Sequence, residues 1–335
     1  MKTLILKPDE IDQAAQIIKN GGIVAMPTET VYGLAANALD GKAVAQIFKA
    51  KGRPMDNPLI VHVVDIAQAK TLVRSFPREA EILAEKFWPG PLTIILPKAD
   101  IIPDEVSAGL DTVAVRIPFD PIARKLISLS CPLAAPSANL SGSPSPTSVK
   151  HVIDDMDGRI DAIIDGGDCE VGVESTVITL AGDRPRLLRP GGITVEQLRE
   201  VIGEVEIDDA VVNPLKDGVK AASPGMKYKH YSPKATVILL RGTSKGYVDY
   251  VNSHNDGKTA ALCYHEETES LNIPYIVLGA ENDQKTQAHN LFTALRQADE
   301  LGIETVYAHC PNRKGVGLAI YNRIIRAAGF EIIEV

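Results

Sequence analysis

The sequence predicts an α/β protein built from two units, each a sheet with helices on its faces. Three observations lead to this fold class. The length of 335 residues is that of about two ordinary domains. Helical and extended patterns alternate along residues 1–205, and a second alternation occupies residues 236–335. The stretch between them, residues 206–235, has few large apolar side chains and is predicted to be a linker.

Residues 1–205 are expected to form the larger, catalytic unit. Helices are expected where apolar residues recur every three or four positions, and strands where short apolar runs lie between turn residues. The expected helices are residues 9–21, 42–52 and 78–87. The expected strands are residues 21–28, 58–64, 91–97, 112–118, the small-residue start of 132–139, 161–167 and 175–180.

The linker and the C-terminal unit follow. Between Lys220 and Lys234 the linker carries His230 and no acidic residue, so it reads as a basic strap, although a solvated linker explains the charge equally well. Its four lysines are Lys220, Lys227, Lys229 and Lys234.

In the C-terminal unit, strands are expected at 236–241, 259–264, 274–279, 305–310 and 331–335, with helices at 288–302 and 317–329. This is the pattern of a small doubly wound domain.

Composition limits the classes of function. The net charge of −8, with acidic residues in excess in both halves, argues against binding nucleic acid through bulk charge, so any anion site must be local. The N-terminal apolar run is too short for a signal peptide, and no run reaches a membrane span of about 20 residues. The four scattered cysteines form no CxxC pair, which favours reduced thiols in a cytoplasmic protein.

Several common catalytic motifs are absent from the sequence. There is no GxxxxGK[ST] phosphate loop, no GxSxG elbow and no HExxH zinc motif. The sequence Gly315-Val316-Gly317 precedes an expected helix but lacks the third glycine of a dinucleotide fingerprint. A tight turn into that helix is therefore the favoured interpretation.

Two polar blocks near the start of the chain follow or contain expected strands. PTETVYGL, residues 27–34, places Thr28 and Thr30 beyond a buried strand, where open sheets bind ligands, although both can equally be turn residues. KAKGRPMDNPLIVH, residues 49–62, holds Lys51 and Arg53 on a stiff turn that suits a polyphosphate. His62 lies inside an apolar strand, where a lone histidine is more often a core residue.

Three further blocks complete the set. Arg116 ends a strand and, if buried, needs an anion, either an internal carboxylate or a substrate carboxylate. Residues 132–147 supply hydroxyls and N–H groups that can cradle phosphate, unless they form a plain Ser/Pro loop. Ser175 and Arg189 stand at later turn–strand junctions. Together the blocks indicate a nucleotide and a small carboxylate in one cleft, with catalysis by positioning and charge neutralisation.

These blocks also resemble a known family. PTETVYGL, KAKGRPxxNPLIVH, WPGPLT, TVAVRIP, APSANxSGxPSPT, GVESTV, LLRPG and SPGMKYKHYSP occur in this order, as in the long form of the YrdC-like threonylcarbamoyl-AMP synthases. The resemblance covers essentially the whole chain, and the series is highly specific. It implies an open, twisted, mixed sheet with helices around a deep positive cavity, a Rossmann-like C-terminal domain and a linker strap that closes over the cavity.

The resemblance implies a nucleotidyltransferase, an L-threonylcarbamoyladenylate synthase. Its substrates would be L-threonine, bicarbonate and ATP with Mg²⁺, and its products threonylcarbamoyl-AMP and pyrophosphate. A separate transferase complex would then modify the adenosine beside the tRNA anticodon, so no stable nucleic-acid binding and no membrane association are expected.

The resemblance also implies roles for particular residues. Threonine would be held by Thr30, His62, Arg116 and Ser175, with Arg116 on its carboxylate. Lys51 and Arg53 would meet the phosphates and carry the catalytic charge. The residues expected on the ATP side are Lys51, Arg53, Asn57, Thr112, Ala135, Ser137, Asn139, Ser145, Arg189 and Tyr231.

Two other functions remain open on the sequence. An RNA-binding module is one, but the acidic charge and the lack of an aromatic-rich basic surface argue against it. A carbamoyl-phosphate-dependent adenylating enzyme is the other, as in hydrogenase maturation proteins with a similar domain. Those proteins add acylphosphatase and zinc-finger segments that this sequence lacks.

Overall fold

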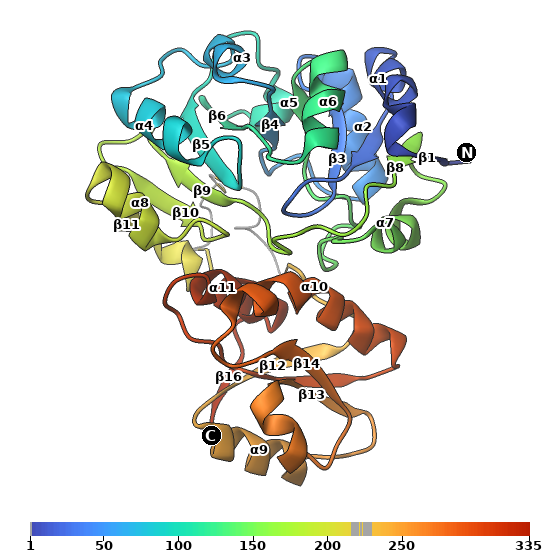
Figure 1. Cartoon of the computed structure of the whole chain (residues 1–335), viewed down its shortest axis with the longest axis vertical. Helices are drawn as coiled ribbons and strands as arrows, with labels where there is room; N and C mark the ends of the chain where they lie inside the picture. Colours follow the sequence, from blue (N-terminus) through green and yellow to red (C-terminus); the bar gives the residue numbers. More distant parts are fainter. Residues whose placement is uncertain (1, 216–220, 222, 224–229) are drawn as a thin grey trace.

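A computed structural model of the chain describes residues 2–215, 221, 223 and 230–335. The predicted strap residues Lys220, Lys227 and Lys229 lie outside the described residues. Within the described part, the strands form an eleven-stranded sheet and a separate five-stranded sheet. Figure 1 shows the two units one above the other, with α10 (Gln284–Glu300) and α11 (Gly317–Ala327) between the sheets.

The N-terminal sheet is mixed, as predicted. Its order is β1-β8-β2-β3-β7-β4-β6-β5-β9-β10-β11; β4 and β6 pair in parallel, whereas β5 and β6 pair antiparallel. The strands are β1 (Leu4–Leu6), β2 (Val24–Met26), β3 (Gly33–Asn37), β4 (Ile60–His62), β5 (Leu92–Pro97), β6 (Thr112–Arg116), β7 (Leu133–Ala134), β8 (Ala162–Ile164), β9 (Thr176–Thr179), β10 (Arg186–Arg189) and β11 (Glu206–Ile207).

Helices cover this sheet, and one of them positions two of the predicted cations. In α2 (Gly41–Lys51), the Asp40 side chain accepts hydrogen bonds from the first turn, and Gly52 ends the helix in the left-handed conformation with φ 62°. This fixed end places Lys51 and Arg53 on either side of Gly52. The other helices are α1 (Ile11–Lys19), α3 (Ile66–Thr71), α4 (Arg78–Phe87), α5 (Asp104–Ser107), α6 (Pro121–Leu129), α7 (Val149–Met156) and α8 (Val195–Ile202).

The strands expected in the N-terminal unit are all shorter than predicted, and two of these differences shape the connections that carry polar residues. The strand expected at 21–28 is limited to β2, and PTETVYGL is the connection by which the chain turns back into the antiparallel strand β3. The strand expected at the start of 132–139 has only two residues, because Pro136 follows it and has no N–H to donate to a neighbouring strand. Polar residues therefore lie on connections at the end of short strands.

The C-terminal sheet is entirely parallel, which confirms the small Rossmann-like unit. Its order is β14-β13-β15-β12-β16. The elements are β12 (Thr236–Arg241), α9 (Ser244–Ser253), β13 (Thr259–Tyr264), β14 (Tyr275–Gly279), α10, β15 (Thr305–His309), α11 and β16 (Ile332–Glu334). Helix α9 was not expected from the sequence. It lies on the outer face of the sheet, opposite α10 and α11 (Figure 1).

The two units share a buried interface along α11. Every residue of this helix is buried, because its apolar side chains pack on the C-terminal sheet while its polar ones reach the N-terminal unit. Asn322 Nδ2 donates to the Val211 carbonyl at 2.6 Å. The boundaries predicted at 205 and 235 remain predictions; the N-terminal sheet extends to Ile207 in β11.

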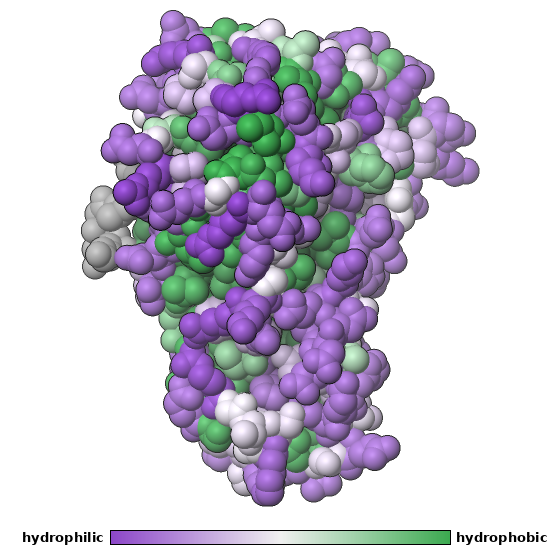
Figure 2. Space-filling view, turned by 60° about the vertical axis from the view of Figure 1, so that its left-hand side comes forward, coloured by the Kyte–Doolittle hydropathy of each residue, from purple (hydrophilic) through white to green (hydrophobic). Residues whose placement is uncertain are grey.

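The polarity of the surface differs between the two units on one face of the molecule. On the face seen in Figure 2, hydrophobic residues gather on the N-terminal unit, and the C-terminal unit is mostly hydrophilic. In the described part of the chain, no helix is long and apolar enough to cross a membrane. All four cysteines are free thiols, as predicted.

Candidate active site

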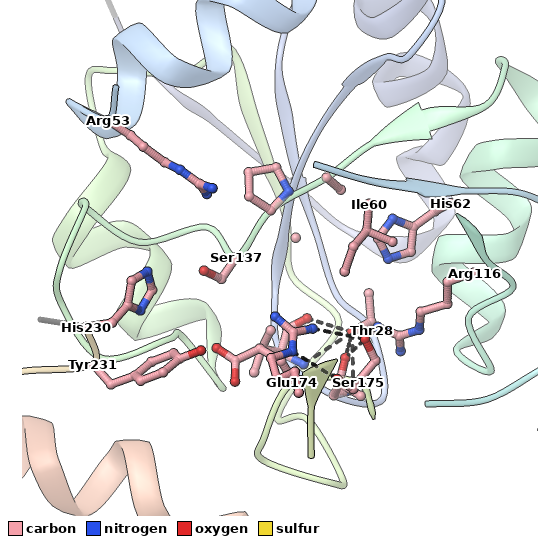
Figure 3. A pocket seen from close by; sticks show the side chains of 16 residues that line it. Thr28, Arg53, Ile60, His62, Arg116, Ser137, Glu174, Ser175, His230 and Tyr231 are labelled. Atoms are coloured by element: carbon pink, nitrogen blue, oxygen red, sulfur yellow. Dashed lines mark hydrogen bonds between the residues drawn. The ribbon is translucent and has the colours of Figure 1, made fainter. Parts of the chain in front are cut away.

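Most of the predicted residues meet in a cavity at the ends of the short central strands. Figure 3 shows Arg53, His230 and Tyr231 reaching it from one side, and His62 and Arg116 from the other. The lining residues are Thr28, Thr30, Val31, Gly33, Arg53, Ile60, His62, Arg116, Ala135, Pro136, Ser137, Glu174, Ser175, Arg189, His230 and Tyr231. The cavity volume is about 40 Å³, well below the several hundred Å³ of a typical ligand pocket.

Arg116 forms the floor at one end of the cavity, together with a carboxylate. Its Nη2 donates to Glu29 Oε1 at 2.6 Å, and both side chains are at most 6% exposed. Its Nη1 donates to Thr30 Oγ1 at 2.9 Å, and Thr30 also hydrogen-bonds Thr28. The internal carboxylate partner is therefore present, and a substrate carboxylate would have to share the guanidinium with Glu29.

His62 lies beside Arg116, because the two residues pair across the parallel strands β4 and β6. Burial, reinforced by the charge of Arg116, lowers the pKa of His62 to about 3, so the ring is neutral at physiological pH. Its buried Nδ1 has no hydrogen-bond partner among the described residues. A buried ring nitrogen without a hydrogen bond destabilises the folded state if the histidine is only a core residue. At a cavity wall, a bound ligand can supply the missing hydrogen bond, so the position of Nδ1 favours a ligand contact.

This burial predicts a pH-dependent stability. The unfolded chain protonates His62 as the pH falls below 6.5, whereas the folded protein does not until about pH 3, so stability is lost as the pH falls through this window. Between pH 8 and pH 5 we expect His62 alone to remove about 2 kcal/mol from the free energy of unfolding.

Urea unfolding at both pH values checks this expectation. The variant His62→Gln keeps a polar side chain that does not titrate, and should reduce the difference between the two pH values by about that amount. The exposed His254→Gln is the matched control and should leave it unchanged. An unaltered pH dependence in His62→Gln would show that the ring is charged in the folded protein.

A hydrogen-bonded group around Ser175 forms the base of the cavity. Ser175 Oγ lies 2.8 Å from Thr93 Oγ1. Arg189, on the neighbouring strand β10, donates from Nη2 to Ser175 Oγ at 3.1 Å and from Nε to the Ser175 carbonyl at 3.0 Å. Burial lowers the pKa of Arg189, because its charge is held away from water. The structure therefore brings Ser175 and Arg189 together, as the sequence indicated.

Arg53 supplies a cation at the other end of the cavity. Its Nη2 donates to the Asn57 carbonyl at 3.2 Å, and its guanidinium lies 5.8 Å from the centre of the Phe48 ring. Burial lowers the pKa of Arg53 to about 10, which leaves it charged at neutral pH. Asn57 Oδ1 is buried and has no partner in the described part of the chain.

Lys51 does not line the cavity; it holds one of the cavity's loops. Its Nζ donates to the carbonyls of Ser137 and Asn139, at 2.7 Å for Asn139. Burial, followed by the charge of Arg53, keeps its pKa well below the usual range. Asn139 is used within the same loop, where Nδ2 donates to Leu140 and Ser143 carbonyls. Ser137 and the backbone at Ala135 reach the cavity.

Three other predicted residues have different positions. Tyr231 lines the cavity and is buried with φ 64°, its ring 5.3 Å from Phe292. Ser145 lies behind the wall and donates to Glu174 Oε1 at 2.5 Å. Thr112 begins β6, four residues before Arg116, and is not among the described lining residues. Its contact with ATP stays a prediction.

The structure also places residues that sequence reasoning did not single out. Glu174 lines the cavity, and its Oε2 accepts from Arg323 Nε of α11 at 3.0 Å. Burial would raise the pKa of Glu174, but Arg323 and Arg189 outweigh it, and the net pKa is lowered. The available signal was weak: Arg323 is one of two arginines in a largely apolar helix, GLAIYNRIIRAAG. The C-terminal unit, in which the sequence indicated no chemistry, therefore contributes to this wall.

No cage for a metal ion is built by the described residues, which contain no group of three histidine, cysteine or carboxylate side chains placed to hold one. Both oxygens of Glu174 are already hydrogen-bonded, to Ser145 and Arg323. The donor set instead suits an ion that arrives with a nucleotide, because Mg²⁺ in such sites takes most of its ligands from phosphate and water.

Comparison with known families and structures gives a consistent result. Residues 16–191 match the Sua5/YciO/YrdC family, described as "Telomere recombination", and residues 193–329 match the family described as "Threonylcarbamoyl-AMP synthase, C-terminal domain". The threonylcarbamoyl-AMP synthase of Pyrococcus abyssi is 48% identical over 96% of this chain and 95% of its own, and that of Bacillus subtilis is 46% identical over 97% and 94%.

Solved structures are similar over the same extent. The crystal structure of P. abyssi Sua5 complexed with L-threonine aligns with a TM-score of 0.91 at 45% identity, covering all of both chains. A second P. abyssi Sua5 structure, a double alanine variant, aligns with a TM-score of 0.93 over 99% of this chain and 98% of its own. These matches include both units, as the predicted fold requires.

Proposed function

The chain belongs to the Sua5/YciO/YrdC family and carries the C-terminal domain of threonylcarbamoyl-AMP synthases, and on this premise we propose that it makes threonylcarbamoyl-AMP and pyrophosphate from L-threonine, bicarbonate and ATP. One observation carries the proposal: a single cavity has an arginine for phosphates at one side and an arginine–histidine pair for a small carboxylate at the other (Figure 3). The protein is then a nucleotidyltransferase.

The reaction divides into two steps. The amine of threonine attacks the carbon of bicarbonate and water leaves, which gives N-carboxythreonine. A carboxylate oxygen of that carbamate then attacks the α-phosphorus of ATP, and the bond to the β-phosphate breaks to release pyrophosphate. Neither step requires a covalent enzyme intermediate, so the protein acts by positioning and charge neutralisation.

The residues at the threonine side have distinct tasks. Arg116 holds the substrate carboxylate, and neutral His62 offers a ring nitrogen to a polar group of threonine without competing as a cation. The hydroxyls of Thr30 and Ser175 are already oriented by Arg116 and Arg189. The P. abyssi complex with L-threonine supports this choice of substrate.

On the nucleotide side, Arg53 neutralises charge that develops on the leaving phosphates, and a Mg²⁺ ion bound with ATP would supply further positive charge there. Lys51 acts indirectly in this conformation, by fixing the loop that presents Ser137. Tyr231 and His230 must move for ATP to enter, because the cavity is much smaller than a nucleotide pocket. Closure by these residues would protect the carbamate and the anhydride from water.

The remaining expectations belong to the same proposal. The product is passed to a separate tRNA threonylcarbamoyl transferase complex, in the cytoplasm, without stable binding of nucleic acid by this chain. The net charge of −8 supports the last point, because a protein with an excess of acidic residues repels the phosphates of nucleic acid overall.

Pyrophosphate release by the purified protein tests the proposal. With ATP, Mg²⁺ and bicarbonate present, release should require L-threonine and should also fall when bicarbonate is removed. Release that depends on carbamoyl phosphate rather than on threonine and bicarbonate would replace the proposal with the adenylating alternative. Retention of tRNA on a filter at physiological salt, without pyrophosphate release, would favour the RNA-binding module.

A further inference from the structure

A second cavity, in the C-terminal unit, has no part in the chemistry above. Its volume is about 440 Å³, within the usual range for small-molecule sites. It opens at the carboxyl ends of the parallel strands: Arg241 ends β12, Tyr264 ends β13 and His309 ends β15. Most of its lining residues are polar, including Arg241, Asn282 and Arg313, so a polar small molecule fits better than an apolar partner.

The chain topology places this cavity at a switch point of the sheet. Strands β12 and β15 are neighbours, but β12 continues to α9 on the outer face and β15 continues to α11 on the inner face (Figure 1). Where adjacent strands send their connections to opposite faces, a crevice opens between the two loops, and open α/β sheets bind ligands there.

A buried polar group forms the floor of the cavity. His309 is 5% exposed, and its Nδ1 lies 2.5 Å from Glu267 Oε1. Glu267 also accepts from Ser244 Oγ at 2.8 Å and from the Tyr264 N–H at 3.0 Å. His309 stacks on Tyr247 at 4.6 Å, so its orientation is fixed. This arrangement leaves Nε2 as the ring nitrogen that a ligand can use.

An arginine is held in place on the wall. Arg313 Cζ lies 4.0 Å from the centre of the Tyr321 ring, and its Nη2 donates to Tyr321 Oη at 2.7 Å. Among the described residues no carboxylate pairs with Arg313, although Arg241 on the opposite wall pairs with Glu334 at 2.9 Å. Glu281 is the single carboxylate among the described lining residues, against two arginines.

The Gly315-Val316-Gly317 turn explains how Arg313 reaches this position. A side chain at Gly317 would lie 2.0 Å from the Asn312 carbonyl, and Gly315 has φ 60°, so both positions require glycine. The turn folds residues 312–314 back over the start of α11. The interpretation of this sequence as a tight turn is confirmed, and its effect is to present Arg313 at the cavity.

We propose that this cavity is a second ligand site, for a small organic anion whose phosphate or carboxylate is held by Arg313, with His309 contacting a neighbouring polar group. Two preorganised nitrogen donors face a hydrophilic cavity at the position where such sheets bind ligands. The site shares no lining residue with the catalytic cavity, and the inference does not rest on the proposed function.

Nuclear magnetic resonance of the ¹⁵N-histidine-labelled full chain tests the site directly. The His309 signals, assigned with His309→Gln, are followed during titration with ribose 5-phosphate and, separately, with succinate. A saturable shift with the first probe identifies a phosphate site, and with the second a carboxylate site; either outcome supports the proposal.

The matched variants are Arg313→Gln and Lys314→Gln, neighbouring exposed cations of which only Arg313 lines the cavity. Loss of the Arg313 charge should weaken binding about tenfold or more, whereas the Lys314 change should not alter it. The thermal midpoint of each variant verifies that it is folded. No saturable His309 shift with either probe, or a shift equally strong in Arg313→Gln, would overturn the proposal.

Discussion

Replacing Arg53 by alanine should lower threonine-dependent pyrophosphate release by about 10²–10³-fold, the usual cost of removing a charged donor that stabilises a transition state. Arg53 is the cavity-lining cation at the side that Tyr231 and His230 also line, where we propose that the nucleotide binds. The effect should fall on kcat, because charge on the leaving phosphates develops as the bond to the α-phosphorus breaks. The KM for threonine should change little, since Arg116 and His62 are untouched.

Lys49→Ala is the matched control for this variant. Lys49 is an exposed cation on the same helix, α2, and its removal should leave the rate unchanged. Arg53→Ala should remain folded, because within the described part of the chain Arg53 makes a single side-chain hydrogen bond, to the Asn57 carbonyl. Full pyrophosphate release by a folded Arg53→Ala protein would remove Arg53 from the catalytic account.

Replacing Arg323 by methionine should impair both stability and catalysis, although the residue lies in the C-terminal unit. Arg323 is fully buried, donates to Glu174 at 3.0 Å and lies 5.6 Å from the centre of the Tyr231 ring. Its loss leaves Glu174 as an unpaired buried carboxylate, which typically costs about 3–5 kcal/mol. A released Glu174 can also pair with Arg189, whose hydrogen bonds orient Ser175.

A second substitution separates positioning from simple destabilisation. Combining Glu174→Gln with Arg323→Met removes the unpaired charge, so stability and kcat should both recover substantially. Arg296→Met is the control, because Arg296 also crosses between the units, to Asp155 at 2.8 Å, but does not line the cavity. It should lower stability without lowering kcat. Equal losses of kcat in Arg323→Met and in the double variant would contradict a role through Glu174.

The sequence was informative about which residues face the cavity. Arg53, Ser137 and Ser175 could be predicted because each lies next to the end of a helix or a short strand, where side chains of an open sheet converge. The alternation of helices and strands likewise predicted two α/β units, and the family resemblance implied the mixed sheet of the larger one. Local patterns of this kind depend on a few neighbouring residues, so they can be read along the chain.

The hydrogen-bond and ion-pair partners of the site residues could not be predicted in the same way. Lys51 carries the charge expected for phosphate, yet its amine is held by the carbonyls of residues 137 and 139. Arg323 meets Glu174 across 149 positions of sequence. Such contacts depend on how separate parts of the chain pack together, and the type of a residue says little about which partner that packing gives it. The acidic partner of Arg116 was foreseen as a possibility, but nothing in the sequence selected Glu29 among the 43 acidic residues.

Mass spectrometry of the reaction product tests the central claim most directly. The purified full chain is incubated with ATP, Mg²⁺, L-threonine and ¹³C-labelled bicarbonate, and the nucleotide products are separated. The account predicts a threonylcarbamoyl adenylate that carries one ¹³C atom, forms with pyrophosphate and disappears in Arg53→Ala. An adenylate without the label, or no adenylate from a folded protein that binds both ATP and threonine, would contradict it.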